Sequence, residues 1–321
     1  MNQNTIRVAV VGVGEFGRNH ARVWSEMEGA ELVGVVDSNP ERAAQVAAEF
    51  KTRVLRDVYA LSTEKVDAVS LAVPTKEHAR VGCNLLDSGI DVLVEKPMAS
   101  SVGEANGLMA SAQRANRILQ IGHLERYNSA VVAVRKIISR PMFFEIHRLG
   151  VFTPRSLDVD VVYDVMIHDL DILLSLVPAP ITDIKAVGIP VMTDKVDIAQ
   201  ARIEFETGTV ANLTASRVST ERVRKLRLFQ PHQYISLDYQ KQEAVAFTVS
   251  GNQQIGFQPL AITKEEPLRL EVESFLEAVA NRGRPLVPGE DGLRALEVAR
   301  AILDKIEEHA KIVTERLQSL T

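Results

Sequence analysis

The stretch IRVAVVGVGEFG, residues 6–17, decides the fold. Its first half is a continuous apolar run of strand length, and Gly12, Gly14 and Gly17 follow at G-x-G-x-x-G spacing. In such a unit the first glycine permits a tight turn, the second lets a pyrophosphate approach the backbone, and the third lets the next helix pack closely on the strand. The N–H groups at the start of that helix attract phosphate. The spacing alone is also compatible with an ordinary turn, so the neighbouring segments decide the interpretation.

The remainder of residues 1–122 alternates between short apolar runs and longer segments with helical periodicity. After the first strand, the apolar runs are 32–36, 66–73, 91–94 and 118–121. The periodic segments include 41–50, 76–88 and 101–116. This alternation predicts an α/β fold in which residues 1–122 form a Rossmann domain with a doubly wound parallel sheet.

The second predicted strand ends in Asp37, twenty residues after Gly17. An acidic side chain at this place accepts hydrogen bonds from the adenosine ribose of a dinucleotide, and its charge repels a 2′-phosphate. The next residues, Ser38 and Asn39, do not supply the arginine that a 2′-phosphate prefers. The sequence therefore favours NAD over NADP as cofactor, although Arg42 lies near enough in the chain to leave use of both open.

From about His123 onward, strands follow one another without helices between them. Two helices come first, at 129–139 and 161–176. The strand-like stretches are 181–192, 199–205, 209–216, 223–229, 234–239 and 244–249, and two closing helices are predicted at 267–281 and 290–310. Consecutive strands imply a largely antiparallel sheet, so residues 123–321 are expected to form a second domain.

Length and composition exclude several classes of protein. A chain of 321 residues is long enough for two domains, each with its own core. The formal net charge of −5 gives no reason to expect nucleic acid or an anionic membrane as a partner. The one cysteine, Cys83, cannot form an internal disulfide, which favours a reducing compartment, and no stretch reads as a signal peptide or a membrane span. The chain is expected to be soluble and cytoplasmic.

The segment VVYDVMIHDLDILLSL, residues 161–176, carries polar side chains at helical spacing in an otherwise apolar sequence. At about 100° per residue, Asp164, His168, Asp171 and Ser175 project onto one narrow stripe, and apolar side chains cover most of the remaining circumference. A surface helix needs an apolar stripe on one side only, so a merely solvated polar edge fits less well. The segment predicts a buried helix with something polar facing this edge.

A second candidate lies in DVLVEKPM, where a predicted strand ends in Glu95, Lys96 and Pro97. Ligands of open α/β folds bind at the carboxyl edge of the sheet, where this strand end is expected. Pro97 disfavours helical geometry at Lys96, so the lysine is expected in an extended, restrained segment. A solvated lysine is the alternative, whereas a lysine next to a nicotinamide would suit proton transfer to or from a hydroxyl.

Several motifs together resemble the glucose-fructose oxidoreductase, inositol dehydrogenase and MocA (Gfo/Idh/MocA) family. They are the fingerprint GVGEFG, the stretch AVPTKEHA, the EKP triplet, the D-x-x-x-H helix, the junction LQIGHLERYN and the closing EDGLRALEVARAIL. The resemblance covers nearly the whole chain. It implies a Rossmann domain, a C-terminal α/β domain built on an open, mostly antiparallel sheet, and homodimers or homotetramers that often pair through that sheet.

The resemblance also implies site residues. Lys96, Asp164 and His168 match the catalytic lysine, aspartate and histidine of the family. The cofactor-binding residues are then expected to be Gly12, Gly14, Glu15, Phe16, Gly17, Asp37, Pro74, Thr75, His78, Glu95 and Pro97. No metal is expected, because in a site built from His168, Asp169 and Asp171 the second residue would point about 140° away from Asp164 on a helical wheel.

These residue types suit the oxidation of an alcohol. A hydride can leave a carbinol carbon only if a base takes the hydroxyl proton at nearly the same time. His168 is the expected base and Lys96 is expected to donate to the same oxygen, although the two roles could be exchanged. Asp164 could contact the substrate or orient the imidazole, and Asp171 is expected outside the reacting groups. A dinucleotide-binding sensor without catalysis is the alternative from another class, but a sensor has no need of Lys96, Asp164 and His168 together.

The substrate prediction rests on arginines and on a finer resemblance. Arginines of the second domain, Arg222 and Arg224 among them, could bind a diphosphate in bidentate fashion or could be ion-paired strand residues. GHLERYN, LDVDVVYDVMIHDLD and TASRVSTERVRKLRLF resemble the branch that oxidises the 3-hydroxyl of UDP-N-acetylglucosamine, apart from Tyr127 and Ser129, where that branch has phenylalanine and proline. The substrate-binding residues expected are Arg126, Asn128, Arg148, Arg155 and Arg217. The expected activity is that of an NAD-dependent sugar dehydrogenase, with a free sugar or an inositol-type polyol as the alternative substrate.

Overall fold

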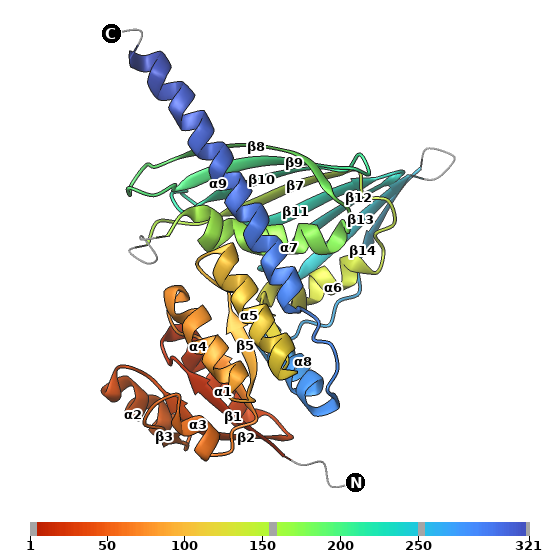
Figure 1. Cartoon of the computed structure of the whole chain (residues 1–321). Coiled ribbons are helices and arrows are strands. Elements are labelled where there is room, and N and C mark those ends of the chain that lie inside the picture. The colour runs from red at the N-terminus through yellow and green to blue at the C-terminus, as the bar shows by residue number, and fades with distance from the viewer. Residues whose placement is uncertain (1–4, 154–158, 250–253, 319–321) are drawn as a thin grey trace. The chain divides into compact units, whose positions relative to one another are not determined.

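A computed structural model describes residues 5–153, 159–249 and 254–318 of the chain (Figure 1). The chain divides into two compact units. The first unit comprises Met1–Leu124 and Glu266–Leu293, and the second comprises Glu125–Glu265 and Arg294–Thr321.

The first unit is built on a six-stranded parallel sheet with the strand order β3-β2-β1-β4-β5-β6 (Figure 1). Its strands are β1 (Ile6–Val11), β2 (Ala30–Val36), β3 (Arg53–Val54), β4 (Ala68–Leu71), β5 (Asp91–Glu95) and β6 (Leu119–Gly122). The chain first winds outward from β1 to β3 and then returns to the other side of β1, so the order reverses between β1 and β4. Sheets of this kind bind ligands outside the carboxyl ends of their strands at this switch point. The predicted Rossmann fold is confirmed.

Helices cover both faces of this sheet (Figure 1). They are α1 (Glu15–Glu26), α2 (Pro40–Glu49), α3 (Ala60–Thr63), α4 (Thr75–Asp87), α5 (Val102–Ala115) and α8 (Pro267–Asn281). The strands read as continuous apolar runs because both of their faces are buried: Val8, Val69 and Val92 are fully enclosed.

Helix α8 belongs to the first unit, although it lies far along the chain. The ring of its Phe275 packs edge-on against the ring of Trp24 in α1, with 6.3 Å between the centroids. Val272 and Val279 join the same apolar cluster. The expected division into two continuous domains, 1–122 and 123–321, differs from the observed units in this returning segment. Apolar periodicity predicts a helix at 267–281 but does not say which core the helix joins.

The second unit is built on an eight-stranded sheet with the order β14-β13-β12-β11-β7-β10-β9-β8 (Figure 1). Its strands are β7 (Phe143–Leu149), β8 (Ile181–Ile189), β9 (Ile198–Phe205), β10 (Val210–Ser216), β11 (Val223–Gln230), β12 (Gln233–Asp238), β13 (Glu243–Val249) and β14 (Ile255–Pro259). Strands β7 and β10 run parallel, and the other paired strands run antiparallel. The prediction of an open, mostly antiparallel sheet is confirmed.

One face of this sheet carries the core of the second unit. The helices on it are α6 (Ser129–Arg135), α7 (Ile167–Leu176) and the part of α9 (Gly289–Gln318) that follows Leu293. Leu170 of α7 and Ile302 of α9 are buried in one cluster with Leu213 and Leu226 of the sheet. Alternation along the strands follows from this one-sided burial, because successive side chains point to opposite faces.

The opposite face of the sheet carries a row of aromatic side chains, one from each of five neighbouring strands. The ring centroids are 5.7, 4.8, 5.3 and 5.2 Å apart along the row, and two of its rings, Phe257 at the outer end and Phe229 within the row, are exposed. This aromatic row consists of Phe143, Phe229, Tyr234, Phe247 and Phe257.

Strand β7 was not among the predicted elements, although it lies in the middle of the sheet. Phe144, Ile146 and Arg148 point to its buried face and alternate with more exposed residues. An arginine at the third buried position interrupts the apolar alternation that indicates a strand. The short β3 and α3 and the edge strand β14 were also missed.

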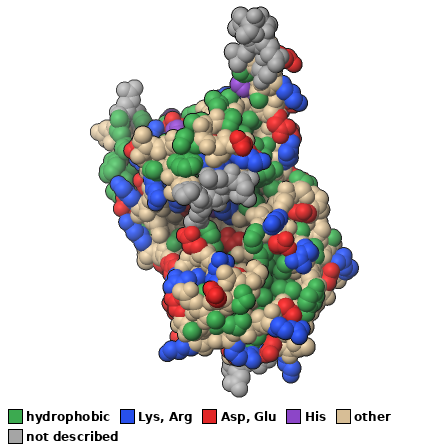
Figure 2. All heavy atoms as spheres, turned by 90° about the vertical axis from the view of Figure 1, so that its left-hand side faces the viewer, with side chains coloured by type: hydrophobic (Ala, Val, Ile, Leu, Met, Phe, Trp, Pro, Cys, Tyr) green, Lys and Arg blue, Asp and Glu red, His purple; other side chains and the backbone are tan. Residues whose placement is uncertain are grey.

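The distribution of charge on the surface and the character of the helices agree with what the composition predicts. Figure 2 shows basic side chains interspersed with acidic and apolar ones on one face, in keeping with a net charge of −5. Within the described part of the chain, no helix combines the length and the apolar character needed to cross a membrane.

Candidate functional site

The glycine fingerprint forms the turn between β1 and α1, and each glycine is required for a different reason. Gly12 has φ of +83°, and a Cβ there would lie 2.7 Å from the backbone of Ala72. A Cβ on Gly17 would lie 1.8 Å from the carbonyl oxygen of Gly12, so α1 can approach the turn only because this residue is glycine. At Gly14, the N-cap of α1, the described residues leave open space where a Cβ would be. Two glycines therefore permit close packing, and the third leaves room for a phosphate at a helix N-terminus.

Asp37, at the end of β2, holds this turn. Its Oδ2 accepts the N–H of Val13 at 2.8 Å, and its Oδ1 accepts the N–H of Asn39 at 2.8 Å. A carboxylate has about four lone-pair positions, so capacity remains for the hydroxyls of a ribose. Arg42 lies 3.7 Å from Oδ2. The residues present therefore fit the adenosine half of NAD.

The loop after β4 is tied to the loop after β5 by a buried histidine. Pro74 is the N-cap of α4 and Thr75 is its first residue, at the carboxyl edge where a cofactor loop was predicted. In the first turn of α4, His78 Nδ1 lies 2.9 Å from the carbonyl oxygen of Pro97, and Nε2 lies 2.8 Å from that of Val73. Burial lowers the pKa of His78, although both carbonyls favour its protonated form. Because both nitrogens are used by the protein, His78 positions these loops.

Lys96 and Pro97 follow β5 at the carboxyl edge of the sheet, as predicted, and both are partly buried. The carboxylate of Glu95 turns back toward the protein: Oε2 accepts the N–H of Lys96 at 3.2 Å, and Oε1 lies 2.9 Å from Nε2 of His20. Burial opposes ionisation, but the hydrogen bond from His20 and the charge of Lys96 lower the pKa of Glu95. His20 was not among the predicted site residues, and its only signal in the sequence is its place one turn before Trp24 on the buried side of α1.

In the second unit, Asp164 lies in a π-helical turn, η2 (Val162–Met166), which leads directly into α7. His168 is the second residue of α7, and both side chains are partly exposed. The regular helix expected over 161–176 is therefore wrong in its first turn, where i→i+5 bonding widens the backbone and shifts the predicted stripe. Turns of this kind are frequent at functional sites.

The other two aspartates of this segment form buried ion pairs. Asp169 receives Nε and Nη2 of Arg148, each at 2.8 Å, and Asp171 receives Nε of Arg126 at 2.9 Å. Burial alone would lower the pKa of Arg148, but the charges of Asp169 and Glu125 outweigh it and raise the pKa, so Arg148 is positively charged between these two carboxyl groups. Each aspartate faces a guanidinium group, which leaves it unsuited to hold a metal with His168. The two pairs anchor the start of α7 inside the unit.

The arginines expected to bind substrate are mostly internal. Arg126 and Arg148 are buried in the pairs just described, and Arg217 is buried 3.4 Å from Asp197 while donating to the carbonyl oxygen of Val159. The ion-pair interpretation therefore describes these three arginines. Sequence could not make this distinction, because exposed and internal arginines look alike in a single chain.

The remaining two residues that were predicted to bind substrate are Asn128 and Arg155. Asn128 is buried: its Oδ1 accepts the N–H of Ala130 at the start of α6, and its Nδ2 donates to the carbonyl oxygen of Tyr239 at 3.0 Å. These bonds make it a helix cap. Arg155 lies outside the described residues.

Arg224, by contrast, is exposed in β11, directly opposite Arg148 of β7. No ion pair of Arg224 occurs among the described residues. Partial burial and the charges of Arg148 and Arg222 lower the pKa of Arg224, although Glu125 and Asp169 oppose them. Arg224 is therefore an exposed guanidinium group without a carboxylate partner of its own in the described part of the chain, which suits the binding of an anion.

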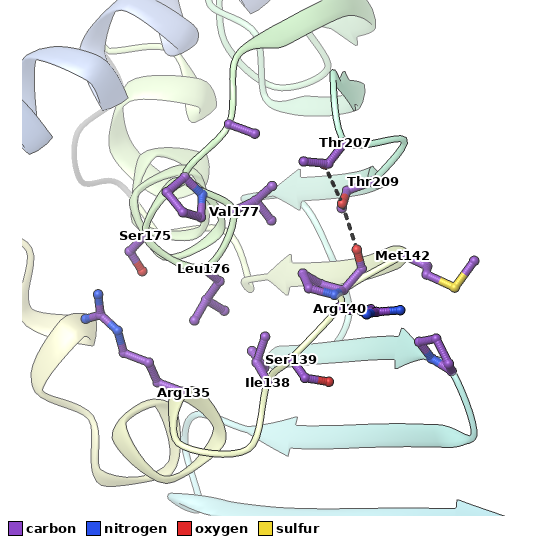
Figure 3. Close-up of a pocket in the computed structure, with 14 residues that line it drawn as sticks. Arg135, Ile138, Ser139, Arg140, Met142, Ser175, Leu176, Val177, Thr207 and Thr209 are labelled. Atoms are coloured by element: carbon purple, nitrogen blue, oxygen red, sulfur yellow. Dashed lines mark hydrogen bonds between the residues drawn. The ribbon is translucent and has the colours of Figure 1, made fainter.

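A separate pocket of about 620 Å³ lies in the second unit (Figure 3). Its lining is mainly apolar and comes largely from the ends of α6 and α7 and the segments that follow them. The β9–β10 turn adds Thr207 and Thr209, and Arg135 and Arg140 lie beside them. Thr209 donates to the carbonyl oxygen of Pro141 at 2.7 Å on one wall. No histidine or carboxylate is among its lining residues, so it lacks the base that the predicted chemistry requires.

Comparison with known proteins agrees with this geometry. Residues 6–123 match the family described as "Oxidoreductase family, NAD-binding Rossmann fold", and residues 131–232 match its "GFO/IDH/MocA C-terminal domain". The chain is 39% identical, over 94% of its own length and 97% of the other, to a protein from Acidithiobacillus ferrooxidans named UDP-N-acetylglucosamine 3-dehydrogenase. The chain belongs to the Gfo/Idh/MocA family. A more distant member, named scyllo-inositol 2-dehydrogenase (NAD(+)) from Bacillus subtilis, is 28% identical over 93% of both chains.

Solved structures of other proteins share this fold. The structure of UDP-N-acetylglucosamine 3-dehydrogenase from Acidithiobacillus ferrooxidans has a TM-score of 0.90 at 38% identity and covers 94% of this chain and 98% of its own. A levoglucosan dehydrogenase in complex with NADH and levoglucosan has a TM-score of 0.86 at 19% identity, covering 94% and 97%. The second likeness shows the fold alone.

Proposed function

We propose that this protein oxidises the 3-hydroxyl group of a UDP-N-acetylhexosamine, with UDP-N-acetylglucosamine as the first candidate, and reduces NAD. The observation that carries the proposal is the 39% identity over 94% of the chain to a protein named UDP-N-acetylglucosamine 3-dehydrogenase. The open space at Gly14 and the acceptor capacity of Asp37 support the cofactor part of it.

Residues of the first unit would hold the cofactor. Gly12, Gly14 and Gly17 would receive the diphosphate at the start of α1, where Glu15 and Phe16 lie, and Asp37 would bind the ribose. Pro74, Thr75 and Pro97 belong to the two loops that His78 ties together. When bound, NAD supplies the acceptor for the hydride that leaves the carbinol carbon.

His168 is proposed as the base. The hydroxyl proton passes to its imidazole as the hydride leaves, and the product is a ketone. Lys96 is proposed to donate to the same oxygen and to stabilise negative charge that develops there. Asp164, in the π turn before His168, is proposed to orient the imidazole or to contact the sugar.

Arg224 is the best candidate of the second unit for the diphosphate of the substrate. It is exposed and forms no ion pair with the described residues, whereas Arg126, Arg148 and Arg217 already face carboxylates. Arginine binds phosphate oxygens in bidentate fashion, so Arg224 with Arg222 could hold the nucleotide half of a UDP-sugar.

The proposal includes a homodimer or homotetramer formed through the sheet of the second unit. Phe257 is 60% exposed and Phe229 is 37% exposed in the aromatic row, together with the neighbouring Ile255 at 74%. Contiguous apolar groups on a surface favour association. Phe257→Lys should shift the protein toward smaller species in analytical ultracentrifugation, and an unchanged assembly would contradict this interface. A cytoplasmic location is also proposed, supported by Cys83 being the only cysteine.

The deciding assay compares substrate classes with the purified full-length protein. NADH formation is measured with UDP-N-acetylglucosamine, UDP-glucose, free N-acetylglucosamine and inositol, and the ketone is captured as an oxime for mass spectrometry. Turnover of inositol without turnover of any UDP-sugar would overturn the proposed substrate. Lys96→Ala and His168→Ala should each lower turnover by about two to four orders of magnitude while NADH binding persists. Near-normal turnover of His168→Ala would refute its assignment as base.

A further inference from the structure

The core of the first unit contains three titratable side chains that come together from distant parts of the chain. They are His20 of α1, Glu95 at the end of β5, and Glu271 of α8, and their ligand-type atoms all lie within 4.8 Å of one another. In the described residues this is the one such group of histidine, cysteine or acidic side chains. The mechanism proposed above uses neither His20 nor Glu271.

Glu95 is fixed on several sides. Its Oε2 accepts the N–H of Lys96 at 3.2 Å, and its Oε1 lies 2.9 Å from Nε2 of His20. Ser70 Oγ accepts Trp24 Nε1–H at 2.8 Å and lies 3.2 Å from His20 Nδ1, so the proton of Ser70 can be donated to Nδ1. Nε2 of His20 then carries the hydrogen that is donated to Glu95. The carboxylate of Glu95 is therefore well supplied with donors.

Glu271 is in the opposite situation. Its side chain is fully buried, and neither carboxylate oxygen has a hydrogen-bond partner among the described residues. The groups around it are His20 on α1, Glu95 at the end of β5, and the neutral Gln120 on β6, whose Nε2 donates to the backbone oxygen of Glu271 at 3.1 Å. A buried carboxylate without donors is strongly unfavourable. Burial first, and then the charge of Glu95, raise the pKa of Glu271 well above its ordinary value.

We propose that Glu271 keeps its proton in the folded protein, so that Glu95 and Glu271 together carry a single negative charge that positions Lys96. Protonated Glu271 gains a hydrogen to donate, and Glu95 is the adjacent charged acceptor. Glu95 holds the backbone of Lys96 in place by accepting its N–H, whereas protonated Glu271 limits the local negative charge to one. Both glutamates are positioning residues. The expected effect on turnover rests on the proposed function of Lys96, but the protonation of Glu271 does not.

Infrared spectroscopy of the full-length protein tests the proton directly, without turnover. A carboxylic acid C=O band should be present at neutral pH, disappear in Glu271→Gln and persist in Glu95→Gln, because burial is the main reason that Glu271 is neutral. If Glu271→Gln removes no such band, Glu271 is ionised and the proposal is overturned. Elemental analysis supplies a second criterion: a stoichiometric divalent cation that is lost in Glu271→Gln would mean that a metal ion occupies the place of the proton.

The pH profile of kcat/KM tests the consequence for Lys96. Glu95→Gln should move the alkaline midpoint of the profile to lower pH by about one unit, because it removes the charge beside Lys96 but keeps an acceptor for its N–H. Glu271→Gln should keep the wild-type midpoint, because it replaces one neutral group by another; Glu271→Met, also uncharged, serves if the first variant does not fold. Equal shifts in the two glutamate variants would show that both are charged and would overturn the proposal. If no UDP-sugar is turned over, the proposed function fails, while the infrared result still decides whether Glu271 is protonated.

Discussion

Replacing Arg148 by methionine should destabilise the protein more than replacing Asp169 by asparagine. Arg148 donates two hydrogen bonds of 2.8 Å to Asp169 and one of 2.8 Å to Glu125. Its guanidinium carbon lies 4.9 Å from the centroid of the Tyr239 ring. Arg148→Met therefore leaves two carboxylates without their cation, which costs about 3–5 kcal/mol for a buried pair. Asp169→Asn leaves Arg148 paired with Glu125 and loses about 1.5–3 kcal/mol, the range for a hydrogen bond to a charged group.

The same pair predicts a pH dependence. Burial raises the pKa of Asp169, and Arg148 opposes this effect. Without Arg148 a proton can replace the guanidinium, and an acid whose pKa is raised on folding contributes stability that is present at low pH and lost as pH rises. The deficit of Arg148→Met should therefore grow by about 1.4 kcal/mol per pH unit between the ordinary pKa of an aspartate and the raised value.

Urea unfolding followed by circular dichroism, at about pH 5 and about pH 8, measures these differences. The double variant Arg148→Met/Asp169→Leu should be more stable than Arg148→Met alone, because it removes a buried charge together with its partner. Equal losses for the two single variants, or a double variant whose loss is the sum of theirs, would refute the reasoning. Asp169 directly follows His168, so turnover should fall together with stability in the single variants.

Three further outcomes are expected. Asp37→Ala combined with Ser38→Arg should narrow or reverse a preference for NAD over NADP in binding titrations, and equal affinity of the unmodified protein for both cofactors would count against the role of Asp37. Arg224→Ala should raise KM for a UDP-sugar by about tenfold to a hundredfold with a smaller change in kcat. The control Arg227→Ala lies on the same strand, but Arg227 is paired with Glu145, so neither KM nor kcat should change. Equal effects of the two substitutions would contradict the proposed diphosphate contact. The stability of Glu271→Gln relative to the wild-type protein should rise by about 1.4 kcal/mol per pH unit from about pH 4.5 until the raised pKa of Glu271 is reached, because only the wild-type protein loses stability there as pH rises. A difference in stability that stays constant between pH 5 and pH 8 would show that this carboxyl does not stay protonated on folding.

The parts of the fold that depend on local pattern could be predicted from the sequence. The strand before Gly12, the glycine spacing and the alternation of strands and helices each arise from neighbouring residues, and the structure places them as expected. Lys96 at the carboxyl edge of β5 is of the same kind, because Pro97 and the end of an apolar run mark it.

The features that sequence missed depend on contacts between distant residues or on unusual local geometry. His20 and Glu271 meet although they are 251 positions apart, and no local pattern of either helix indicates the other. The role of Arg148 follows from its partner Asp169, and its burial also concealed strand β7. The π turn around Asp164 has the composition of an ordinary helix, so its i→i+5 bonding could not be inferred from a 3.6-residue period.

The return of α8 to the first unit affects how the chain is made. During synthesis from the N-terminus, all six parallel strands leave the ribosome long before Phe275, so Trp24 lacks its partner until the whole second sheet has been translated. The first unit therefore receives its last helix only after the second sheet has been translated, and until then the apolar surface that α8 covers must stay out of other contacts. Any early stop before α8 leaves the first unit without both its apolar cover and Glu271.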